Sequence, residues 1–456
     1  MKRESDWLPV LGPEKGRLHE RLAEAITQAI LSGELEPGAA LPAHRSVANG
    51  LDLSLGTVTR AYDILQRRGL TRSEKGRGTF VAGRTPRREM GFDLSVNLPP
   101  PILTTKLLAG LMGRVAAGLD ADIFNQYLPP AGLLEHRIAL AKAIGGGRSF
   151  EADPDRLMIT NGAQHGLFIA LAASPSGPIA MEEFTYPGAL RAARTLSRPL
   201  VPIAMDAEGV VPGALRKALN APEPPTTLYA MPSLQNPTGA TMSRERREEL
   251  VEIARSHDLL LIEDDVYSVF VSSDIPTLAE LAPERTFHVG SLSKSFAPGL
   301  RVGHILAPPD RLDACLSWLQ ATQSMAHPLS ALAMAQGIAE GLTDGVSKSV
   351  RAEAEKRCSV ARDVLGDILA PQEFDGLHVW APMETDRARD IVMAAARRNI
   401  TLAPPAAFLV DPQSRQSGLR FCLGTLSEAD LERTLKDLKE LLSVRSDANL
   451  DFGPVA

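Results

Sequence analysis

Short apolar runs that alternate with helical stretches constrain the fold of this chain more than any other feature. Each run has the length of a single strand, and they occupy residues 157–159, 177–180, 227–230, 259–262 and 287–289. Continuous apolar runs are typical of strands buried on both faces, and strands that alternate with helices form parallel sheets. The sequence therefore predicts an α/β fold in which helices cover both faces of a mainly parallel sheet.

Four polar motifs lie at the ends of such strands. They read ITNGAQHG at 159–166, MPSLQNPTG at 231–239, LIEDDVY at 261–267 and SLSKSFAPGLRVG at 291–303. Open α/β sheets carry their functional groups at the carboxyl ends of the strands. We therefore expect the four motifs to converge on one site.

The motif at 291–303 is the most informative of the four. It places Lys294 among serines, and Arg301 follows seven residues later. A lysine that forms a Schiff base needs a fixed position and a lowered pKa, while serines and an arginine suit a phosphate dianion. The glycine turn at 159–166 opens a helix whose first backbone N–H groups can receive the same phosphate.

Together, the motifs resemble the fold type I aminotransferases, which use pyridoxal 5'-phosphate, over residues from about 93 to 442. The resemblance implies that Lys294 forms the internal aldimine with the cofactor. It implies that Asp264 pairs with the pyridinium nitrogen, which keeps the ring an electron sink. Tyr186 would stack on the ring, completing the catalytic set.

The same resemblance assigns the remaining contacts to cofactor and substrate. Asn236 and Tyr267 would hydrogen-bond the phenolate oxygen of the ring, and Arg420 would bind the α-carboxylate of a substrate or effector. The other implied cofactor-binding residues are Ala163, Gln164, Ser291, Ser293, Arg301 and, from a second subunit, Tyr127.

Each of these residues also has an ordinary structural interpretation. Tyr186 and Tyr127 fit half-buried aromatic positions. Asp264 fits a structural carboxylate, and Arg420 fits an ion pair on a strand face. A lone lysine in a serine-rich turn is usually a surface residue. Because strand side chains alternate, Glu263 and Asp265 should point away from Asp264, and we expect no chemistry from them.

The first 81 residues carry a different pattern. Apolar residues recur at helical spacing over 18–30, a second helix follows Pro42, and a third begins near Ser54, a helix-capping residue type. Two short strands flank a glycine-containing turn between residues 70 and 81. Three helices and a hairpin predict a winged helix-turn-helix.

The runs GELEPGAALPAHRSVA, LSLGTVTRAYDILQRRGL and GRGTFV, between residues 18 and 83, resemble the DNA-binding domain of GntR-type bacterial regulators. The family commonly has arginine where this chain has Leu55, and often asparagine or threonine where it has Gly56. The absence of that arginine would change or relax the preferred DNA sequence. Thr57 and Thr59 also fit a purely helix-capping or packing role. The implied DNA-binding residues are Arg45, Ser54, Thr57, Thr59, Arg60 and, in the wing, Arg77, Gly78 and Thr79.

The distribution of charge supports two parts with different partners. The net charge of the 456-residue chain is −6, but residues 1–89 hold 15 Lys and Arg against 11 Asp and Glu. The remainder holds 34 Lys and Arg against 44 Asp and Glu. An N-terminal segment with a net charge of +4 therefore precedes a larger part with a net charge of −10. A basic segment suits DNA, although it is also typical of an ordinary solvated face.

Cysteines and hydropathy bear on metal binding and location. Cys315, Cys358 and Cys422 are widely separated, and neither Cys422 nor His165 has metal-ligand spacing, so we expect packing roles and no metal site. Such cysteine usage fits a reducing cytosol.

No run approaches the ~18 apolar residues of a membrane span, and the first ten residues lack the apolar core of a signal peptide. We expect a cytoplasmic protein with no membrane partner.

A winged helix-turn-helix joined to an aminotransferase-like domain resembles the MocR subgroup of GntR regulators. The predicted divisions are a DNA-binding domain at 13–83, a linker at 84–100, a pyridoxal-phosphate domain at 101–445 and a tail at 446–456. The resemblance implies a homodimeric transcription factor that binds double-stranded DNA and senses an amino acid, an amine or pyridoxal phosphate. The alternatives are a working aminotransferase that carries a DNA-binding module, and a DNA-binding protein that has lost its cofactor.

Overall fold

The chain divides into two units, Met1–Met90 and Gly91–Ala456, and each is described by itself. The computed structural model describes residues 7–11, 17–31, 34–35, 38–67, 70–74, 78–81, 91–145 and 152–443. Residues 84–90 of the predicted linker, the predicted tail and Arg77 lie outside these residues. Residues 91–100 of the predicted linker belong to the second unit.

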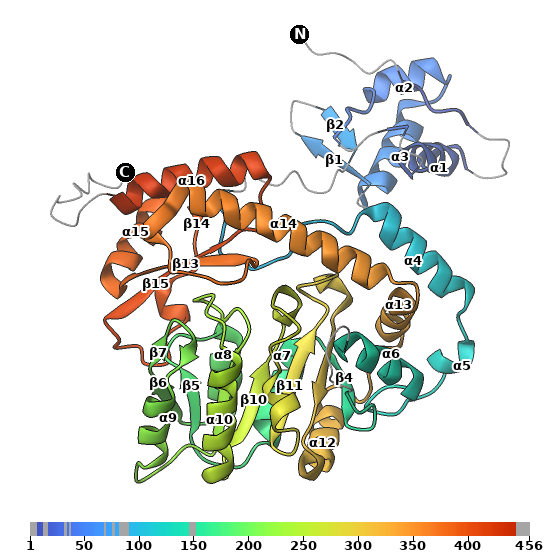
Figure 1. The fold of residues 1–456 in the computed structure, drawn as a ribbon. Coiled ribbons are helices and arrows are strands. Elements are labelled where there is room, and N and C mark those ends of the chain that lie inside the picture. Colours follow the sequence, from blue (N-terminus) through green and yellow to red (C-terminus); the bar gives the residue numbers. More distant parts are fainter. Residues whose placement is uncertain are drawn as a thin grey trace. The chain divides into compact units, whose positions relative to one another are not determined.

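The N-terminal unit contains three helices and a hairpin (Figure 1). Its elements are α1 (Leu18–Leu31), α2 (His44–Gly50), α3 (Leu55–Arg67), β1 (Thr71–Glu74) and β2 (Gly78–Val81). The strands pair antiparallel, with Thr71 opposite Val81. Leu22, Ile26 and Leu65 are fully buried between the helices, so this unit has a core of its own. The predicted winged helix-turn-helix is confirmed.

Local contacts fix the start of α3 in that unit. The Ser54 side-chain oxygen accepts a hydrogen bond from the Thr57 backbone N–H at 3.1 Å. It thereby satisfies one of the N–H groups that a helix leaves without a partner in its first turn. The Tyr62 hydroxyl donates to the Pro42 carbonyl at 2.9 Å, which ties α3 to the segment that precedes α2.

A seven-stranded sheet with the order β4-β12-β11-β10-β9-β5-β6 forms the centre of the second unit. Its strands are β4 (Leu157–Asn161), β5 (Ile179–Glu182), β6 (Leu200–Ile203), β9 (Thr227–Ala230), β10 (Leu260–Asp264), β11 (Thr286–Ser291) and β12 (Val302–Leu306). All five predicted strands are present, and β6, β5, β9, β10 and β11 pair parallel. β12 runs antiparallel to both of its neighbours, β11 and β4. The predicted mainly parallel sheet is confirmed.

Helices cover both faces of this sheet, as the alternation of side chains along β10 shows. Ile262 packs in the same apolar cluster as Leu167 of α7 (Ala163–Ala173). The preceding Leu261 packs instead with Leu250 of α10 (Arg244–Ser256). Successive strand residues point to opposite faces, so α7 and α10 lie on opposite sides of the sheet.

A smaller lobe with its own apolar core consists mostly of residues that follow the sheet in sequence, together with β3 from before it (Figure 1). Its elements are β13 (His378–Glu384) paired antiparallel with β15 (Gln416–Cys422), β14 (Ile400–Thr401) paired parallel with β3 (Phe92–Asp93), α14 (Leu342–Leu365), α15 (Thr385–Arg397) and α16 (Glu428–Ser443). None of the helices within the described ranges is long and apolar enough to cross a membrane.

The remaining elements connect these parts. The helices are α4 (Thr105–Ala117), α5 (Ala121–Phe124), α6 (Leu134–Gly145), α8 (Pro187–Thr195), α9 (Pro212–Leu219), α11 (Leu278–Leu281), α12 (Leu312–Gln323) and α13 (Pro328–Ala339). A short hairpin consists of β7 (Met205–Asp206) and β8 (Gly209–Val210). Single 3-10 turns occupy Ser268–Phe270, Pro298–Leu300, Pro309–Arg311, Gly366–Ile368 and Pro405–Ala407.

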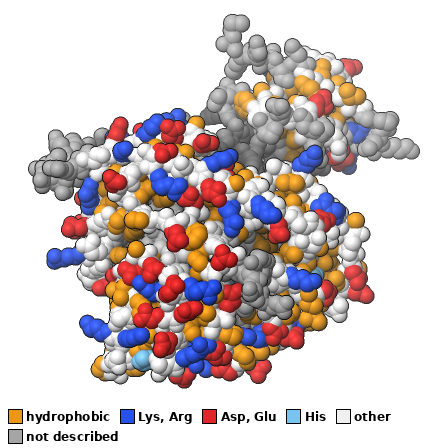
Figure 2. All heavy atoms as spheres, in the orientation of Figure 1, with side chains coloured by type: hydrophobic (Ala, Val, Ile, Leu, Met, Phe, Trp, Pro, Cys, Tyr) orange, Lys and Arg blue, Asp and Glu red, His pale blue; other side chains and the backbone are white. Residues whose placement is uncertain are grey.

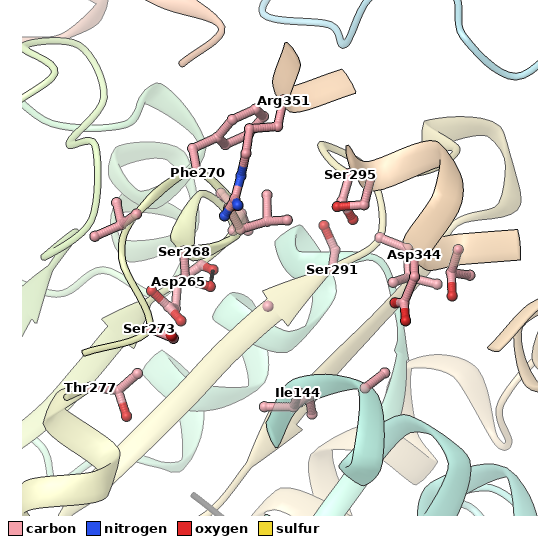
Figure 3. Close-up of a pocket in the computed structure, with 18 of the residues that line it drawn as sticks. Ile144, Asp265, Ser268, Phe270, Ser273, Thr277, Ser291, Ser295, Asp344 and Arg351 are labelled. Atoms are coloured by element: carbon pink, nitrogen blue, oxygen red, sulfur yellow. Dashed lines mark hydrogen bonds between the residues drawn. The ribbon is translucent and has the colours of Figure 1, made fainter. Parts of the chain in front are cut away.

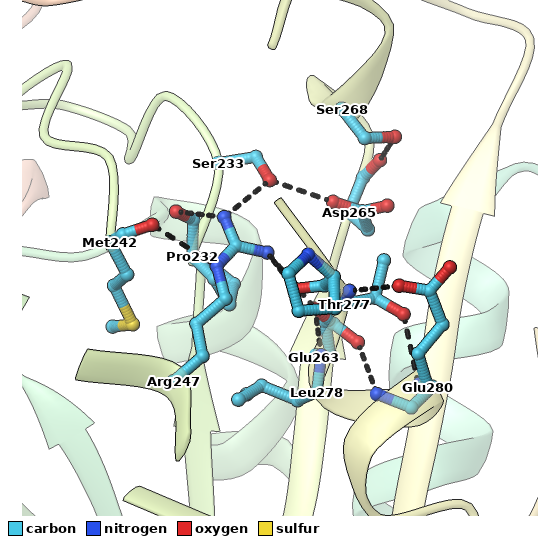
Figure 4. Close-up of polar contacts among 12 residues, drawn as sticks. Pro232, Ser233, Met242, Arg247, Glu263, Asp265, Ser268, Thr277, Leu278 and Glu280 are labelled. Carbon is cyan, nitrogen blue, oxygen red and sulfur yellow. Dashed lines mark hydrogen bonds and ion pairs between the residues drawn. The ribbon is translucent and has the colours of Figure 1, made fainter. Parts of the chain in front are cut away.

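A fully buried arginine joins several of these elements (Figure 4). The Arg247 guanidinium of α10 donates to the carbonyl oxygens of Met242, Pro276 and Pro232 at 2.9–3.1 Å. It also lies 3.9 Å from the buried carboxylate of Glu263. Glu263 in turn accepts hydrogen bonds from the first two backbone N–H groups of α11, at 2.9 Å each. The pair therefore ties α10, β10 and α11 together.

We predict that Arg247→Ala strongly destabilises the second unit. Removing one partner of a buried pair leaves the other charge uncompensated, at a cost of about 3–5 kcal/mol. The matched control is Arg244→Ala on the same helix, whose side chain is half exposed and lies 3.7 Å from Glu248. Urea denaturation of the full chain should shift its midpoint much more for Arg247→Ala, and equal midpoints would contradict the prediction.

Candidate functional site

The four predicted motifs meet at the carboxyl ends of the central strands. Asp264 is the last residue of β10, Ser291 is the last residue of β11, and Ala163 is the first residue of α7. Lys294 lies in the turn after β11, and Tyr186 precedes the first residue of α8. Parallel pairing of β9, β10 and β11 places these ends at one edge of the sheet.

The Lys294 amine is held close to a carbonyl and an aromatic ring. Its Nζ donates to the Asn97 backbone oxygen at 2.5 Å and lies 5.7 Å from the centre of the Tyr267 ring. Burial lowers the pKa of Lys294 to about 8, and the nearby Arg420 charge also lowers it. A larger fraction of the amine is therefore unprotonated and nucleophilic near neutral pH than for an ordinary lysine.

Asp264 presents an unsatisfied oxygen at the same edge. Its side chain is 2% exposed, and Oδ2 accepts a hydrogen bond from the Tyr229 hydroxyl at 2.9 Å. Its Oδ1 is buried with no hydrogen-bond partner among the described residues. Burial raises the pKa of Asp264 to about 6, although the Tyr229 hydrogen bond and the Lys294 charge lower it. A buried acceptor without a partner suits a ligand N–H, such as a protonated ring nitrogen.

The start of α7 forms a cradle that suits phosphate. Gly162 has φ +75°, and a Cβ atom there would lie 2.3 Å from the Arg301 guanidinium. Arg301 Nη2 donates to the Asn161 carbonyl at 3.2 Å. Ser291 Oγ accepts from the Ser293 backbone N–H at 3.2 Å. Glycine lets the arginine approach the helix N-terminus, where backbone N–H groups and the helix dipole favour an anion.

Gln164 and Tyr186 border this cradle. Gln164 Nε2 donates to the Gly188 carbonyl at 3.0 Å, and its Oε1 has no partner among the described residues. A Cβ on Gly188 would lie 2.3 Å from Tyr186 Cε1, so the ring packs directly on the start of α8. Tyr186 is half-buried, and burial raises its pKa. These contacts hold the ring beside the strand ends.

Arg420 forms a buried cationic group on the side of the smaller lobe. Its Nη1 donates to Asn236 Oδ1 at 2.7 Å, and its Nη2 donates to the Ser95 carbonyl at 2.5 Å. Its Nε is buried without a partner among the described residues. The guanidinium carbon lies 4.9 Å from the centre of the Phe408 ring. Arg420 therefore keeps one donor for an acidic ligand group.

Tyr127 stands apart from these residues. Its side chain is 87% exposed, and it lies in the connection between α5 and α6. The structure thus brings the other predicted cofactor and effector residues to one edge of the sheet, while Tyr127 points to solvent within a single chain.

Sequence reasoning missed several residues that contact this site. Asn97 lies in the predicted linker, yet it is buried, and its Nδ2 donates to the Tyr267 hydroxyl and reaches His378 Nδ1, both at 2.9 Å. Tyr229 was only part of an apolar strand. Glu182 is fully buried at the end of β5, and burial raises its pKa to about 8. Glu182 could have been predicted from the sequence, because it is a carboxylate at the end of a strand, as Asp264 is.

Among the predicted DNA-binding residues that the structure describes, Arg45 lies on α2, Ser54 directly precedes α3, and the others lie on α3 or β2. Arg45 and Arg60 are exposed. Thr57 Oγ1 lies 2.8 Å from Ser54 Oγ, and Thr59 Oγ1 donates to the Leu55 carbonyl at 3.0 Å. Both threonines therefore make local helix contacts as well. In the hairpin, Gly78 begins β2 with φ +120°, and Thr79 Oγ1 lies 3.4 Å from the hydroxyl oxygen of Ser73.

Comparison with protein families supports both parts of the chain. Residues 100–438 match the family described as aminotransferase class I and II. Residues 18–81 match the bacterial regulatory proteins of the gntR family.

Curated relatives share both parts. The HTH-type pyridoxine biosynthesis transcriptional regulator PdxR of Corynebacterium glutamicum is 29% identical, with 96% of this chain and 99% of the relative covered. The HTH-type transcriptional regulator TauR of Rhodobacter capsulatus is 27% identical over 91% of this chain and 94% of its own length. The domain order and these relatives match the MocR subgroup.

Solved structures show the same fold in the second unit. The α-aminoadipate aminotransferase LysN of Thermus thermophilus, complexed with N-(5'-phosphopyridoxyl)-L-leucine, superposes with a TM-score of 0.70 at 24% identity. The match covers 78% of this chain and 92% of LysN. The predicted fold type I domain is confirmed.

We predict that Lys294 of the cofactor-free protein becomes reactive at unusually low pH. Because its pKa is lowered to about 8, labelling by an amine-selective reagent should reach half its maximum near pH 8. Peptide mass spectrometry over a pH series measures this midpoint. Since the Arg420 charge lowers the pKa, Arg420→Gln should raise the midpoint, whereas Arg415→Gln, at an exposed position before β15, should not. An unshifted midpoint in Arg420→Gln would show that the Arg420 charge is not a cause of the lowered Lys294 pKa.

Proposed function

The chain belongs to the aminotransferase class I and II family and carries a gntR-family domain, and we propose that it is a transcriptional regulator. In this proposal the first unit binds double-stranded DNA, and the second binds pyridoxal 5'-phosphate and senses an amino acid or amine. The observation that carries it is the combination of a folded winged helix-turn-helix with an intact strand-end site in one chain. Named regulators that match nearly its full length support the same reading.

The chemistry of the strand-end site fits pyridoxal phosphate. Bound there, the cofactor would supply an aldehyde that reacts with amines and a ring that withdraws electrons. Asp264 Oδ1 would accept the ring N–H, and Arg301, Ser291 and the α7 N-terminus would hold the phosphate. Lys294 would hold the cofactor at its aldehyde group. Asn236 and Tyr267 would contact the phenolate oxygen, beside Tyr186.

We propose an effector that carries a carboxylate and a primary amine. Arg420 has a buried Nε without a partner among the described residues, so it can receive a carboxylate. An incoming amine would compete with Lys294 for the same aldehyde carbon. A released Lys294 would then be free to donate to the Asn97 carbonyl, as it does in this structure, near the start of the second unit. Such a difference in contacts between the bound and free states is what a sensor requires.

The rival proposal is a working aminotransferase, which the same site residues support. Lys294 would serve as the base for proton transfer, and Asp264 and Arg420 would keep their roles. A 2-aminoadipate transaminase of Thermus thermophilus is 26% identical over 76% of this chain. A panel of amino acids and keto acids separates the two proposals, because sustained release of a new amino acid at enzyme-like rates favours the enzyme.

We also propose a cytoplasmic homodimer. The 87% exposure of Tyr127 fits a side chain that completes the site of a second copy. All three cysteines are unpaired and buried, which fits a reducing compartment. The proposed divisions are 13–83 for DNA binding, 84–90 for the linker and 91–445 for the cofactor domain, since residues 91–100 belong to the second unit, with a tail from 446.

We predict that Lys294→Ala abolishes covalent attachment of the cofactor and leaves DNA binding intact. Borohydride reduction followed by mass spectrometry should find the cofactor on Lys294 in the parent protein and none in the variant. The effector should then no longer change the DNA footprint. Lys436→Ala, at an exposed position on α16, is the control. A normal effector response in Lys294→Ala would rule out the covalent sensing mechanism.

We predict that Arg45→Ala and Arg60→Ala weaken DNA binding. Each lost phosphate contact should reduce the slope of log affinity against log salt by about 1, while a lost base contact should cost about 1–3 kcal/mol of discrimination. Fluorescence anisotropy with DNA from upstream of the gene measures both quantities. Arg389→Ala, on α15 of the second unit, is the control and should bind DNA as the parent does. Unchanged affinity in both Arg45→Ala and Arg60→Ala would exclude these two residues from the DNA interface.

A further inference from the structure

A large cavity with both polar and apolar walls lies on the other side of β11 from α7 (Figure 3). Its volume is about 840 Å³, within the range of small-molecule sites. The walls come from the end of α6, the loop after β10, the strands β11 and β12 and the first half of α14. Among the residues assigned to the cofactor, only Ser291 lines it. The cavity is therefore a separate feature from the strand-end site.

Two stacked histidines form part of its wall. The His288 and His304 rings lie 5.3 Å apart, centre to centre, and His304 Nε2 is 3.2 Å from His288 Nδ1. His288 Nε2 is 3.1 Å from Asp265 Oδ2, and Asp265 Oδ1 accepts from the Ser233 hydroxyl at 3.0 Å. Figure 4 shows Ser233 between Asp265 and the Arg247 guanidinium. The wall is thus anchored to the buried arginine of α10.

His304 offers an unsatisfied nitrogen to the cavity. It is 6% exposed, and its Nδ1 has no hydrogen-bond partner among the described residues. Because Asp265 accepts from His288 Nε2, a neutral His288 accepts from His304 Nε2, which leaves His304 Nδ1 as an acceptor. A protonated His288 donates instead, which makes Nδ1 a donor. A hydroxyl group satisfies Nδ1 in both cases, because it can donate and accept.

Further hydroxyls line the same space. Ser295, Thr343 and Ser347 line the cavity, and their side chains make no hydrogen bond among the described residues. Thr343 is 7% exposed. Burial also lowers the pKa of His304 to about 3, so its ring stays neutral at physiological pH. Uncharged donors and acceptors on several walls suit a ligand that carries several hydroxyl groups.

A cationic group stands at the rim. Arg351 of α14 donates from Nε and Nη2 to the Val269 carbonyl, at 2.9 and 2.5 Å, and this contact fixes its guanidinium over the cavity (Figure 3). Lys348 lies one turn earlier on the same helix, and neither cation forms an ion pair within the described residues. Asp344 also lines the rim, but it lies in the first turn of α14, where N–H groups offset its charge. Glu355, one turn beyond Arg351, also lines the cavity, and so does Asp265, whose carboxylate oxygens are bonded to His288 and Ser233.

We propose that this cavity is a second small-molecule site, which takes a hydroxylated organic anion. The anionic group would bind Arg351 and Lys348 at the rim, and hydroxyl groups would reach His304, Thr343 and Ser295. The ligand is a polyhydroxy carboxylate or a sugar phosphate, which share this chemistry. Because Ser291 borders both sites, occupancy of the cavity would act on the turn that carries Lys294. Binding itself does not depend on the function proposed for the strand-end site.

Calorimetric titration of the cofactor-loaded full chain tests the proposal with four probes. D-gluconate and D-glucose 6-phosphate carry both required features, whereas D-glucose lacks the anionic group and inorganic phosphate lacks the carbon-bound hydroxyls. We expect gluconate, glucose 6-phosphate or both to bind at least about tenfold more tightly than glucose and phosphate. The preferred probe identifies the ligand as a carboxylate or a phosphate ester.

Two variants keep the test specific. Arg351→Gln should weaken the preferred probe by about tenfold or more, and His304→Phe should weaken it while keeping the ring volume. Arg362→Gln, farther along α14 and outside the cavity, is the control and should bind as the parent does. Neither anion binding at up to about 10 mM, glucose binding equally well, or binding unaffected by Arg351→Gln would overturn the proposal.

Discussion

Parallel pairing of β9, β10 and β11 is the constraint on which the candidate cofactor site depends. Because these strands run in one direction, their carboxyl ends lie at one edge, and residues far apart in sequence meet there. Asn236, Asp264 and Lys294 come from the ends of three different strands or the segments that follow them for this reason. The flanking strands, the helices and the smaller lobe then close this edge from several sides, and Arg420 and Asn97 add polar groups from the smaller lobe and from the segment before α4.

Three consecutive carboxylates near the end of β10 show how alternation along a strand separates structural from chemical roles. Asp264 points toward the face of α7 and leaves one oxygen for a ligand. Glu263 points toward the other face, where it accepts from the N-terminus of α11 and lies beside Arg247. Asp265, just beyond the strand, orients His288. All three are buried, and each is stabilised by different partners. Asp264 thus has hydrogen-bond partners different from those of its two neighbours, although the Asp265 charge still raises its pKa.

Much of this architecture was readable from the sequence, because apolar runs and glycine-bearing turns are local signals. The five strands, the winged helix-turn-helix and the strand-end position of Lys294 and Asp264 follow from them. The antiparallel direction of β12 was not readable, since pairing direction depends on the path of the chain. Asn97 was missed because it lies in an irregular, proline-rich segment whose course is set by tertiary contacts. Arg247 was missed because its helix carries several arginines, and only packing decides which one is buried.

The separate core of the N-terminal unit has a practical consequence. All residues of the strand-end site belong to the second unit, so under the proposed function DNA recognition and effector recognition would use separate units. An N-terminal unit of different DNA specificity, joined through the same connecting segment, would direct an unchanged second unit to another gene. Under the proposed function, the DNA target could therefore be changed, by evolution or by design, without altering the effector site.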